Sequence, residues 1–241
     1  MKILPTLAAA ALFVLALPAA ADEAAIRKAL AASLPDTELG PIRKLPKLDL
    51  YEVVVNRREI IYTDATGELA LVGRLVDVRS QENLTERRKT ELSKVDFSAL
   101  PLERAIVTVK GNGARKLAVF SDPDCPYCKQ LERELEGITD VTVYTFLFPL
   151  ASIHPDATRK ARLIWCAPDR ARAWSDMMLK GREPDSAGTC ETPINANLEL
   201  GEKLAIDGTP GIVFASGRLV PGLIKRDVLE RYLSEKELPR G

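Results

Sequence analysis

The sequence is poor in the residues that build metal centres and disulfide-held scaffolds. Its 241 residues include a single histidine, His154, and only four cysteines. A chain of this length with so few cysteines must be held together by a hydrophobic core, which leaves the cysteines free for particular tasks. The sequence also lacks an excess of charge of one sign, with 34 basic and 34 acidic side chains. This balance argues against a nucleic acid or an anionic membrane surface as a partner.

Long apolar runs are missing after the first 21 residues. The segment Met1–Ala21 carries Lys2, the apolar run Leu7–Leu17 and three alanines that end at Ala21. The run is shorter than the ~20 apolar residues that cross a bilayer, so the segment is typical of a secretory signal peptide cleaved after Ala21. An uncleaved anchor is the alternative. Export would place the cysteines in a compartment where disulfides persist.

Two of the cysteines lie where a predicted strand gives way to a predicted helix. The apolar run Leu117–Phe120 is typical of a strand, and Leu131 and Leu135 stand four residues apart among charged helix formers. Cys125 and Cys128 lie between these elements. A C-x-x-C pair that follows a strand and opens a helix is the arrangement of a thioredoxin-type redox site.

The position of the pair predicts which sulfur is the nucleophile. Cys125 lies near the helix N-terminus, where unpaired N–H groups and the helix dipole favour a thiolate. Pro126 suits the first helical position, and Cys128 follows about one turn along. The carboxylates of Asp122 and Asp124 oppose this effect, because nearby negative charge raises a thiol pKa. We expect a lowered pKa for Cys125 and a reversible disulfide with Cys128.

A zinc site is the alternative for a C-x-x-C pair. Such a site would bring a second close pair of ligands, whereas Cys166 and Cys190 are far from each other in the sequence. His154 has no Cys, Asp or Glu at metal-ligand spacing, so a surface or capping role is expected for it. We expect neither a metal nor a cofactor.

Several motifs together resemble a known family. They are Lys110-Gly-Asn-Gly113, the run Phe120–Cys128, Trp165-Cys-Ala167, Gly208-Thr-Pro210 and Leu219-Val-Pro-Gly222. In these motifs the chain resembles the periplasmic thiol:disulfide interchange proteins of the DsbC/DsbG family. The resemblance implies an α+β fold whose C-terminal part is a thioredoxin fold.

The N-terminal part predicts one helix and several strands. Ile26, Leu30 and Leu34 predict an amphipathic helix that Pro35 ends. Short apolar segments then predict an antiparallel meander, with strands at 50–55, 59–63, 69–72 and 75–78. About sixty residues bury a small core, so such a unit often needs a partner surface. The resemblance implies a cystatin-like domain that forms a homodimer by edge-strand pairing, and a monomeric appendage is the alternative.

The charged segment Asn83–Val95 predicts a largely solvated helix capped by Asn83, and the resemblance favours a connector between domains. A long helical stretch, Pro155–Leu204, predicts an insertion in the thioredoxin fold. The domains expected are therefore a signal peptide (1–21), a dimerisation domain (22–80), a linker helix (81–97) and a catalytic domain (98–241).

The remaining site residues follow from the family. Proteins of the DsbC type carry a second cysteine pair, so Cys166 and Cys190 are expected to form a structural disulfide that closes a 25-residue loop. A proline before the strand that faces the C-x-x-C pair is cis in thioredoxin folds, and Pro210 matches it. That turn leaves the backbone of Thr209 open to pair with an extended substrate. Pro126 and Tyr127 are also expected to contact substrate. This dipeptide departs from DsbC, which has glycine at the first position, and matches DsbG.

The function expected is disulfide isomerisation or reduction in exported proteins through a mixed disulfide at Cys125, with chaperone-like substrate binding. The resemblance also implies a membrane-bound thiol reductant of the DsbD type as a partner. Two alternatives remain open, a thiol oxidase that introduces disulfides and a dimeric holdase chaperone.

Overall fold

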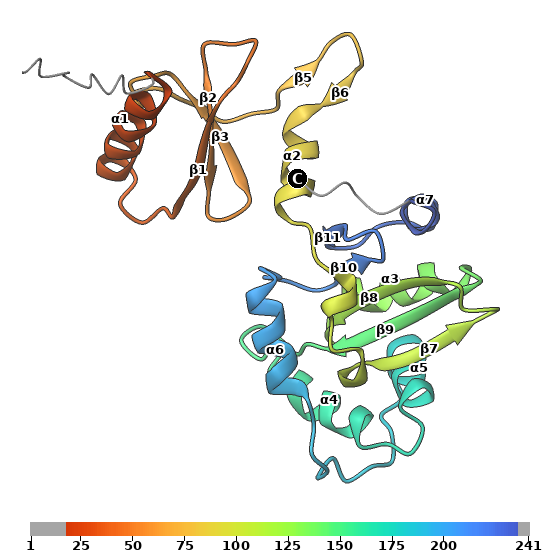
Figure 1. The fold of residues 1–241 in the computed structure, drawn as a ribbon. Coiled ribbons are helices and arrows are strands. Elements are labelled where there is room, and N and C mark those ends of the chain that lie inside the picture. Colours follow the sequence, from red (N-terminus) through yellow and green to blue (C-terminus); the bar gives the residue numbers. More distant parts are fainter. Residues whose placement is uncertain (1–17, 236–241) are drawn as a thin grey trace, which may run out of the picture. The chain divides into compact units, whose positions relative to one another are not determined.

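The computed structural model describes residues 18–235, and the chain divides into two compact units, Met1–Leu92 and Ser93–Gly241 (Figure 1). Most of the predicted signal peptide lies outside the described residues. Among the residues described, no helix is long and apolar enough to cross a membrane.

The first unit is a helix packed on a four-stranded antiparallel sheet. The helix α1 spans Pro18–Ser33, and the strand order is β1 (Leu39–Lys44), β2 (Tyr51–Val55), β3 (Glu59–Thr63) and β4 (Ala70–Leu71). Ile26 and Leu30 of α1 are buried against Tyr51 and Val53 of β2. Leu34, which the apolar spacing placed in the same stripe, follows the end of the helix and is 37% exposed.

The meander differs from the prediction at both ends. Strand β1 was not expected, because Gly40 and Pro41 weaken its strand signal; it is an edge strand whose register shifts between Leu39 and Ile42. The predicted strand at 75–78 is not part of this sheet. Its residues form β5 (Val76–Asp77), which pairs only with β6 (Glu82–Asn83) in a separate hairpin.

The charged helix α2 (Leu84–Leu92) begins as predicted, because the side-chain oxygen of Asn83 accepts a hydrogen bond from the N–H of Glu86 at 3.0 Å. It is less solvated than expected. The buried Thr85 hydroxyl lies 2.5 Å from the hydroxyl of Tyr62, and the Arg88 guanidinium pairs at 3.0 Å with the buried carboxylate of Glu52. The helix therefore belongs to the first unit.

The second unit is built on a five-stranded mixed sheet with the order β11-β10-β8-β9-β7. The strands are β7 (Ile106–Lys110), β8 (Arg115–Ser121), β9 (Val141–Leu147), β10 (Gly211–Phe214) and β11 (Leu219–Pro221). Strands β8 and β9 are parallel, and the other pairs are antiparallel. Two short 3-10 helices, Phe97–Ala99 and Leu102–Arg104, precede the sheet.

The central strand β8 is apolar on both faces because both faces are covered. Leu117 and Val119 face a cluster that includes Leu131 of α3 (Pro126–Glu136) and Leu229 of α7 (Arg226–Leu233). Ala118 and Phe120 alternate with them and face a second cluster on the opposite side. This β8–α3–β9 crossover, completed by β10, β11 and α7, is a thioredoxin fold.

The predicted insertion consists of three helices between β9 and β10 (Figure 1). They are α4 (Ala157–Trp165), α5 (Arg170–Lys180) and α6 (Ile194–Lys203). Trp174 and Met178 of α5 lie in the same buried cluster as the two cysteines of α3. The insertion therefore closes one side of the redox pair.

Candidate active site

The turn between β8 and α3 is folded by its own polar groups. The side-chain oxygen Oδ1 of Asp122 accepts a hydrogen bond from the N–H of Asp124 at 2.7 Å, and its backbone carbonyl accepts one from the N–H of Cys125 at 3.2 Å. Cys125 is the N-cap of α3, and Pro126 occupies the first helical turn. This turn fixes Cys125 at the N-terminal end of the helix.

Asp122 is fully buried, and its second oxygen has two partners. Oδ2 accepts the N–H of Leu150 at 2.7 Å and lies 3.0 Å from Nδ1 of His154. The expectation of a surface or capping role for His154 did not include this contact, in which the partly buried ring lies against the Asp122 carboxylate. This pair was not recognisable from the sequence, because 32 residues separate its members.

The two thiols are buried, and their surroundings shift their pKa values in opposite directions. Cys125 is 3% exposed and Cys128 is fully buried. Hydrogen bonds from the Cys128 thiol, from Thr209 and from backbone N–H groups outweigh burial and lower the pKa of Cys125 to about 5. Burial, together with the hydrogen bond to Cys125, raises the pKa of Cys128. At neutral pH this geometry favours a Cys125 thiolate beside a Cys128 thiol.

The loop before β10 reaches the nucleophile. The Thr209-Pro210 peptide bond is cis, and Sγ of Cys125 lies 3.4 Å from the carbonyl oxygen of Thr209. Pro126 and Tyr127 are exposed beside the pair, with Tyr127 60% exposed. The structure thus brings together Cys125, Cys128 and Thr209 although 84 residues separate Cys125 from Thr209.

The carboxylate next to the nucleophile is neutralised by the insertion. Nζ of Lys160, on α4, lies 2.6 Å from Oδ1 of Asp124, and both side chains are largely buried. The ion pair raises the pKa of Lys160. Asp124, which the sequence led us to expect as an opposing charge on Cys125, therefore shares its negative charge with a cation.

The other two cysteines are joined, with Sγ of Cys166 and Sγ of Cys190 2.04 Å apart. Cys166 caps the C-terminus of α4, and Cys190 precedes α6. The Nε of Arg162 also donates to the carbonyl of Gly188 at 3.0 Å, so two links tie this loop to α4.

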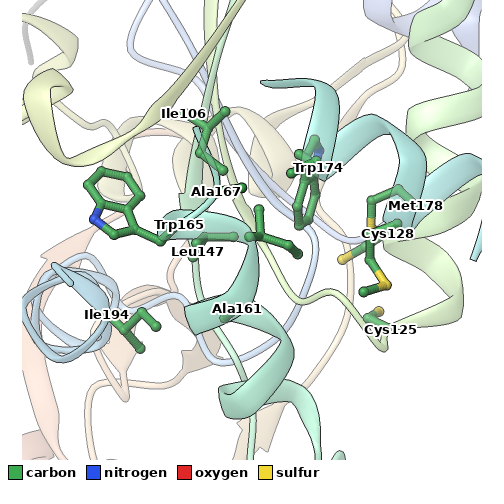
Figure 2. Close-up of a cluster of buried hydrophobic side chains, with 13 residues drawn as sticks. Ile106, Cys125, Cys128, Leu147, Ala161, Trp165, Ala167, Trp174, Met178 and Ile194 are labelled. Atoms are coloured by element: carbon green, nitrogen blue, oxygen red, sulfur yellow. The ribbon is translucent and has the colours of Figure 1, made fainter. Parts of the chain in front are cut away.

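A carboxylate that sequence reasoning did not single out lies on α3. Glu132 stands four residues after Cys128, and the indole N–H of Trp174 donates to its Oε1 at 2.8 Å. In Figure 2, Trp174, Met178 and Cys128 lie together at one end of the buried cluster. The signal available in the sequence was the spacing of four residues between Cys128 and Glu132 on a predicted helix. Other acidic residues on the same helix made Glu132 hard to single out.

Among the residues that the structure describes, no group of three or more His, Cys, Asp or Glu side chains is placed to hold a metal ion.

Comparisons with known proteins cover both units. Residues 102–237 match the family model of a thioredoxin-like domain, and residues 17–86 match that of the disulfide bond isomerase protein N-terminal domain. The probable thiol:disulfide interchange protein DsbC of Bordetella pertussis is 42% identical over 209 residues, which cover 87% of this chain and 73% of that protein. The DsbC of Escherichia coli is 28% identical over 223 residues, covering 91% and 90%.

A solved structure is similar as well. The crystal structure of a disulfide interchange protein from Neisseria gonorrhoeae matches with a TM-score of 0.56 and 48% identity, covering 58% of this chain and all of that one. The chain is therefore similar to these proteins in its sequence, in its two matched domains and in its fold.

Proposed function

Because the chain belongs to the DsbC family of thiol:disulfide interchange proteins, we propose that it rearranges wrong disulfides in exported proteins through a mixed disulfide at Cys125. Family membership and the thioredoxin-like domain make the chain a thiol:disulfide oxidoreductase of the disulfide isomerase type. Beyond this activity, we propose which residues react, in which direction electrons flow and in which compartment the protein acts.

The reaction proceeds by thiol–disulfide exchange. The Cys125 thiolate attacks one sulfur of a substrate disulfide, and the other substrate sulfur leaves as a thiolate. A second substrate thiolate then attacks the mixed disulfide and releases Cys125, which is isomerisation without net electron transfer. When Cys128 attacks instead, the substrate is reduced by two electrons and the Cys125–Cys128 disulfide forms.

The observation that carries the proposal is the position of Cys125, which caps the N-terminus of α3 and has its sulfur beside Cys128 and the loop at Thr209. The Cys125 pKa of about 5 means that the sulfur is a thiolate at neutral pH, which is the form that attacks disulfides. A free cysteine, with a pKa of about 8.5, would be mostly protonated at this pH. The Cys125 thiol donates to the carbonyl of Thr209 at 3.4 Å, and once the sulfur is a thiolate this carbonyl can accept from an extended substrate strand, as in recognition by strand addition.

The N-terminal domain supports the proposed assembly, and the predicted signal peptide supports the proposed location. The disulfide bond isomerase N-terminal domain supports a homodimer, which would hold substrate between two catalytic domains and give chaperone-like binding. The predicted signal peptide supports export to the periplasm. Keeping the pair reduced in an oxidising compartment requires a thiol reductant, and we propose a membrane-bound one of the DsbD type.

The test is the reactivation of scrambled ribonuclease by the reduced chain without its leader, beside the truncated chain Ser93–Gly241. We expect the longer chain to restore ribonuclease activity. The truncated chain should reduce insulin disulfides but restore little ribonuclease activity, because it lacks the N-terminal domain. Cys125→Ser should abolish both reactions, whereas Cys166→Ala/Cys190→Ala, which leaves the redox pair intact, should retain both.

Two outcomes would contradict the proposal. If neither chain reactivates ribonuclease while the oxidised form rapidly introduces disulfides into a reduced substrate, the protein is an oxidase. If Cys125→Ser keeps full protection of an unfolded substrate against aggregation and the wild-type chain exchanges no disulfides, the protein is a holdase.

A further inference from the structure

The resolving step needs a group that takes a proton from Cys128. This thiol is fully buried, and burial raises its pKa, so at neutral pH it must lose a proton before it can attack the mixed disulfide. The thiolate next to it is consumed when Cys125 enters the mixed disulfide. Another proton acceptor is therefore needed close to the Cys128 thiol.

Glu132 is placed to be that acceptor. It follows Cys128 by four residues on α3, and residues with this spacing lie on one face of a helix with Cβ atoms about 5–6 Å apart. Its carboxylate is held at a known point, because the indole N–H of Trp174 donates to it at 2.8 Å. Trp174 is 2% exposed and belongs to the buried cluster that contains Cys128 (Figure 2).

The groups around Glu132 raise its pKa, so its carboxylate takes up a proton more readily than a free one does. Burial raises its pKa, and the negative charge of Glu136 on the same helix raises it further. The N–H of Trp174 and the ammonium of Lys110, at the end of β7, act in the opposite direction. Nζ of Lys110 donates at 2.6 Å to the carbonyl of Leu135, and this hydrogen bond holds the ammonium group of β7 against α3.

We propose that Glu132 accepts the proton of Cys128 when Cys128 resolves the mixed disulfide, and that Trp174 holds the carboxylate in position. This assignment rests on the proposed function. The proton passes from the Cys128 thiol to the Glu132 carboxylate, either directly or through one water molecule. The Cys128 thiolate then attacks Sγ of Cys125. The Cys125–Cys128 bond forms, the bond from Cys125 to the substrate breaks, and the substrate sulfur leaves as a thiolate that takes up a proton.

The experiment separates attack from resolution. The full chain is reduced and mixed with oxidised glutathione, and the protein–glutathione mixed disulfide is trapped by acid at successive times between pH 5 and 9. Alkylation of Cys125 by iodoacetamide measures the nucleophile alone. The variant is Glu132→Gln, and Glu134→Gln is the matched control, since Glu134 lies on the same helix and Gln can still accept the hydrogen bond from the Arg226 N–H.

In Glu132→Gln we expect resolution at pH 7 to be about a hundredfold or more slower, because a positioned general base is lost. The mixed disulfide should accumulate. In the wild type the plot of resolution rate against pH should show an inflection where the Glu132 carboxyl titrates, and this inflection should be absent in the variant. Alkylation of Cys125 should be nearly unchanged. Glu134→Gln should behave as wild type in both measurements.

Trp174→Phe is the second variant, because it keeps an aromatic ring in the cluster and removes the N–H donor. It should retain the inflection but move it to higher pH, since an unpaired carboxylate is easier to protonate. A merely structural role for either residue would lower thermal stability without moving this inflection.

The proposal is overturned if Glu132→Gln resolves the mixed disulfide at the wild-type rate across the pH range. It is also overturned if the variant loses its inflection no more than Glu134→Gln does. Failure of the proposed function looks different, because the wild-type chain would then form no mixed disulfide with glutathione.

Discussion

At the scale of single residues, the two active-site sulfurs divide the work because their surroundings treat negative charge differently. Cys125 caps α3 and receives hydrogen bonds that favour its thiolate, whereas Cys128 is buried one turn further on. The Cys128 thiol is itself the largest contributor to the low pKa of Cys125. The resolving cysteine therefore activates the nucleophile before it ever attacks.

This dependence predicts that Cys128→Ala raises the pKa of Cys125. A hydrogen bond to a charged group contributes about 1.5–3 kcal/mol, which corresponds to a rise of about 1–2 pKa units. In the reduced wild-type chain, thiolate absorbance at 240 nm should rise with a midpoint at pH about 5. Because only the thiolate is alkylated, the rate of alkylation should rise through the same pH and level off above it.

In Cys128→Ala both curves should move together toward higher pH. Cys166→Ala/Cys190→Ala serves as the control, since its redox pair is untouched. An unchanged midpoint in Cys128→Ala would mean that the helix N-terminus and Thr209, rather than the second thiol, hold the charge.

The sequence predicted the reacting cysteines of this site better than the residues that surround and position them. Cys125 and Cys128 stand in a local motif, so strand, turn and helix signals were enough to interpret them. Glu132 and Trp174 were missed, because their contact joins positions 42 residues apart and depends on how α5 packs against α3. The His154–Asp122 pair was missed for the same reason.

At the scale of elements, the insertion is attached to the active site through α4. Lys160 of α4 pairs with Asp124 just before the nucleophile, and the Cys166–Cys190 disulfide fastens the far end of the same helix to the loop before α6. The loop between the two cysteines spans 24 positions and includes α5, which carries Trp174.

Removal of this disulfide should therefore destabilise the second unit more than it disturbs the chemistry. For Cys166→Ala/Cys190→Ala we expect a loss of roughly 3 kcal/mol in the free energy of unfolding, from the entropy of the opened loop. Urea unfolding followed by Trp fluorescence measures it, with the Cys125–Cys128 pair kept reduced in both proteins. Iodoacetamide alkylation of Cys125 should be unchanged. A loss below about 1 kcal/mol would indicate that the Arg162–Gly188 hydrogen bond and apolar packing alone hold the loop.

Elements with strong periodicity were predicted well, and short edge strands were not. The helices α1 and α3 and the strands β2, β3 and β8 follow clear apolar patterns. Strand β7 was missed although its residues Ile106-Val-Thr-Val109 are all β-branched and typical of a strand. The hairpin β5–β6 was misassigned, since two-residue strands depend on tertiary contacts rather than on local preference.

At the scale of the whole molecule, the first unit has an open apolar edge. Strand β4 is the last strand of its sheet, and Leu71 and Val72 at its end are 55% and 82% exposed. Leu69 before it and Val78 beyond it are also exposed. An exposed apolar edge strand of this kind pairs readily with another chain. We therefore expect β4 and the residues around it to form the interface of the proposed homodimer.

The variant Leu71→Asp tests this interface, because pairing two copies would bring two carboxylates close together at an apolar contact. We expect the dissociation constant of the dimer to rise by at least about tenfold, equivalent to about 1.4 kcal/mol. Sedimentation equilibrium measures this change. Val109→Asp is the matched control, since it places the same charge on an exposed valine of the edge strand β7 in the second unit.

Disulfide reduction and disulfide isomerisation should then differ in their need for the first unit. The Leu71→Asp monomer should still reduce disulfides, because Cys125, Cys128 and Thr209 lie within the second unit, but it should reactivate scrambled ribonuclease poorly. Dimers that persist in Leu71→Asp would place the interface elsewhere on the chain. A monomer that isomerises as well as the wild type would mean that one catalytic domain is sufficient, because the mixed disulfide alone then keeps the substrate in place until the correct thiol attacks.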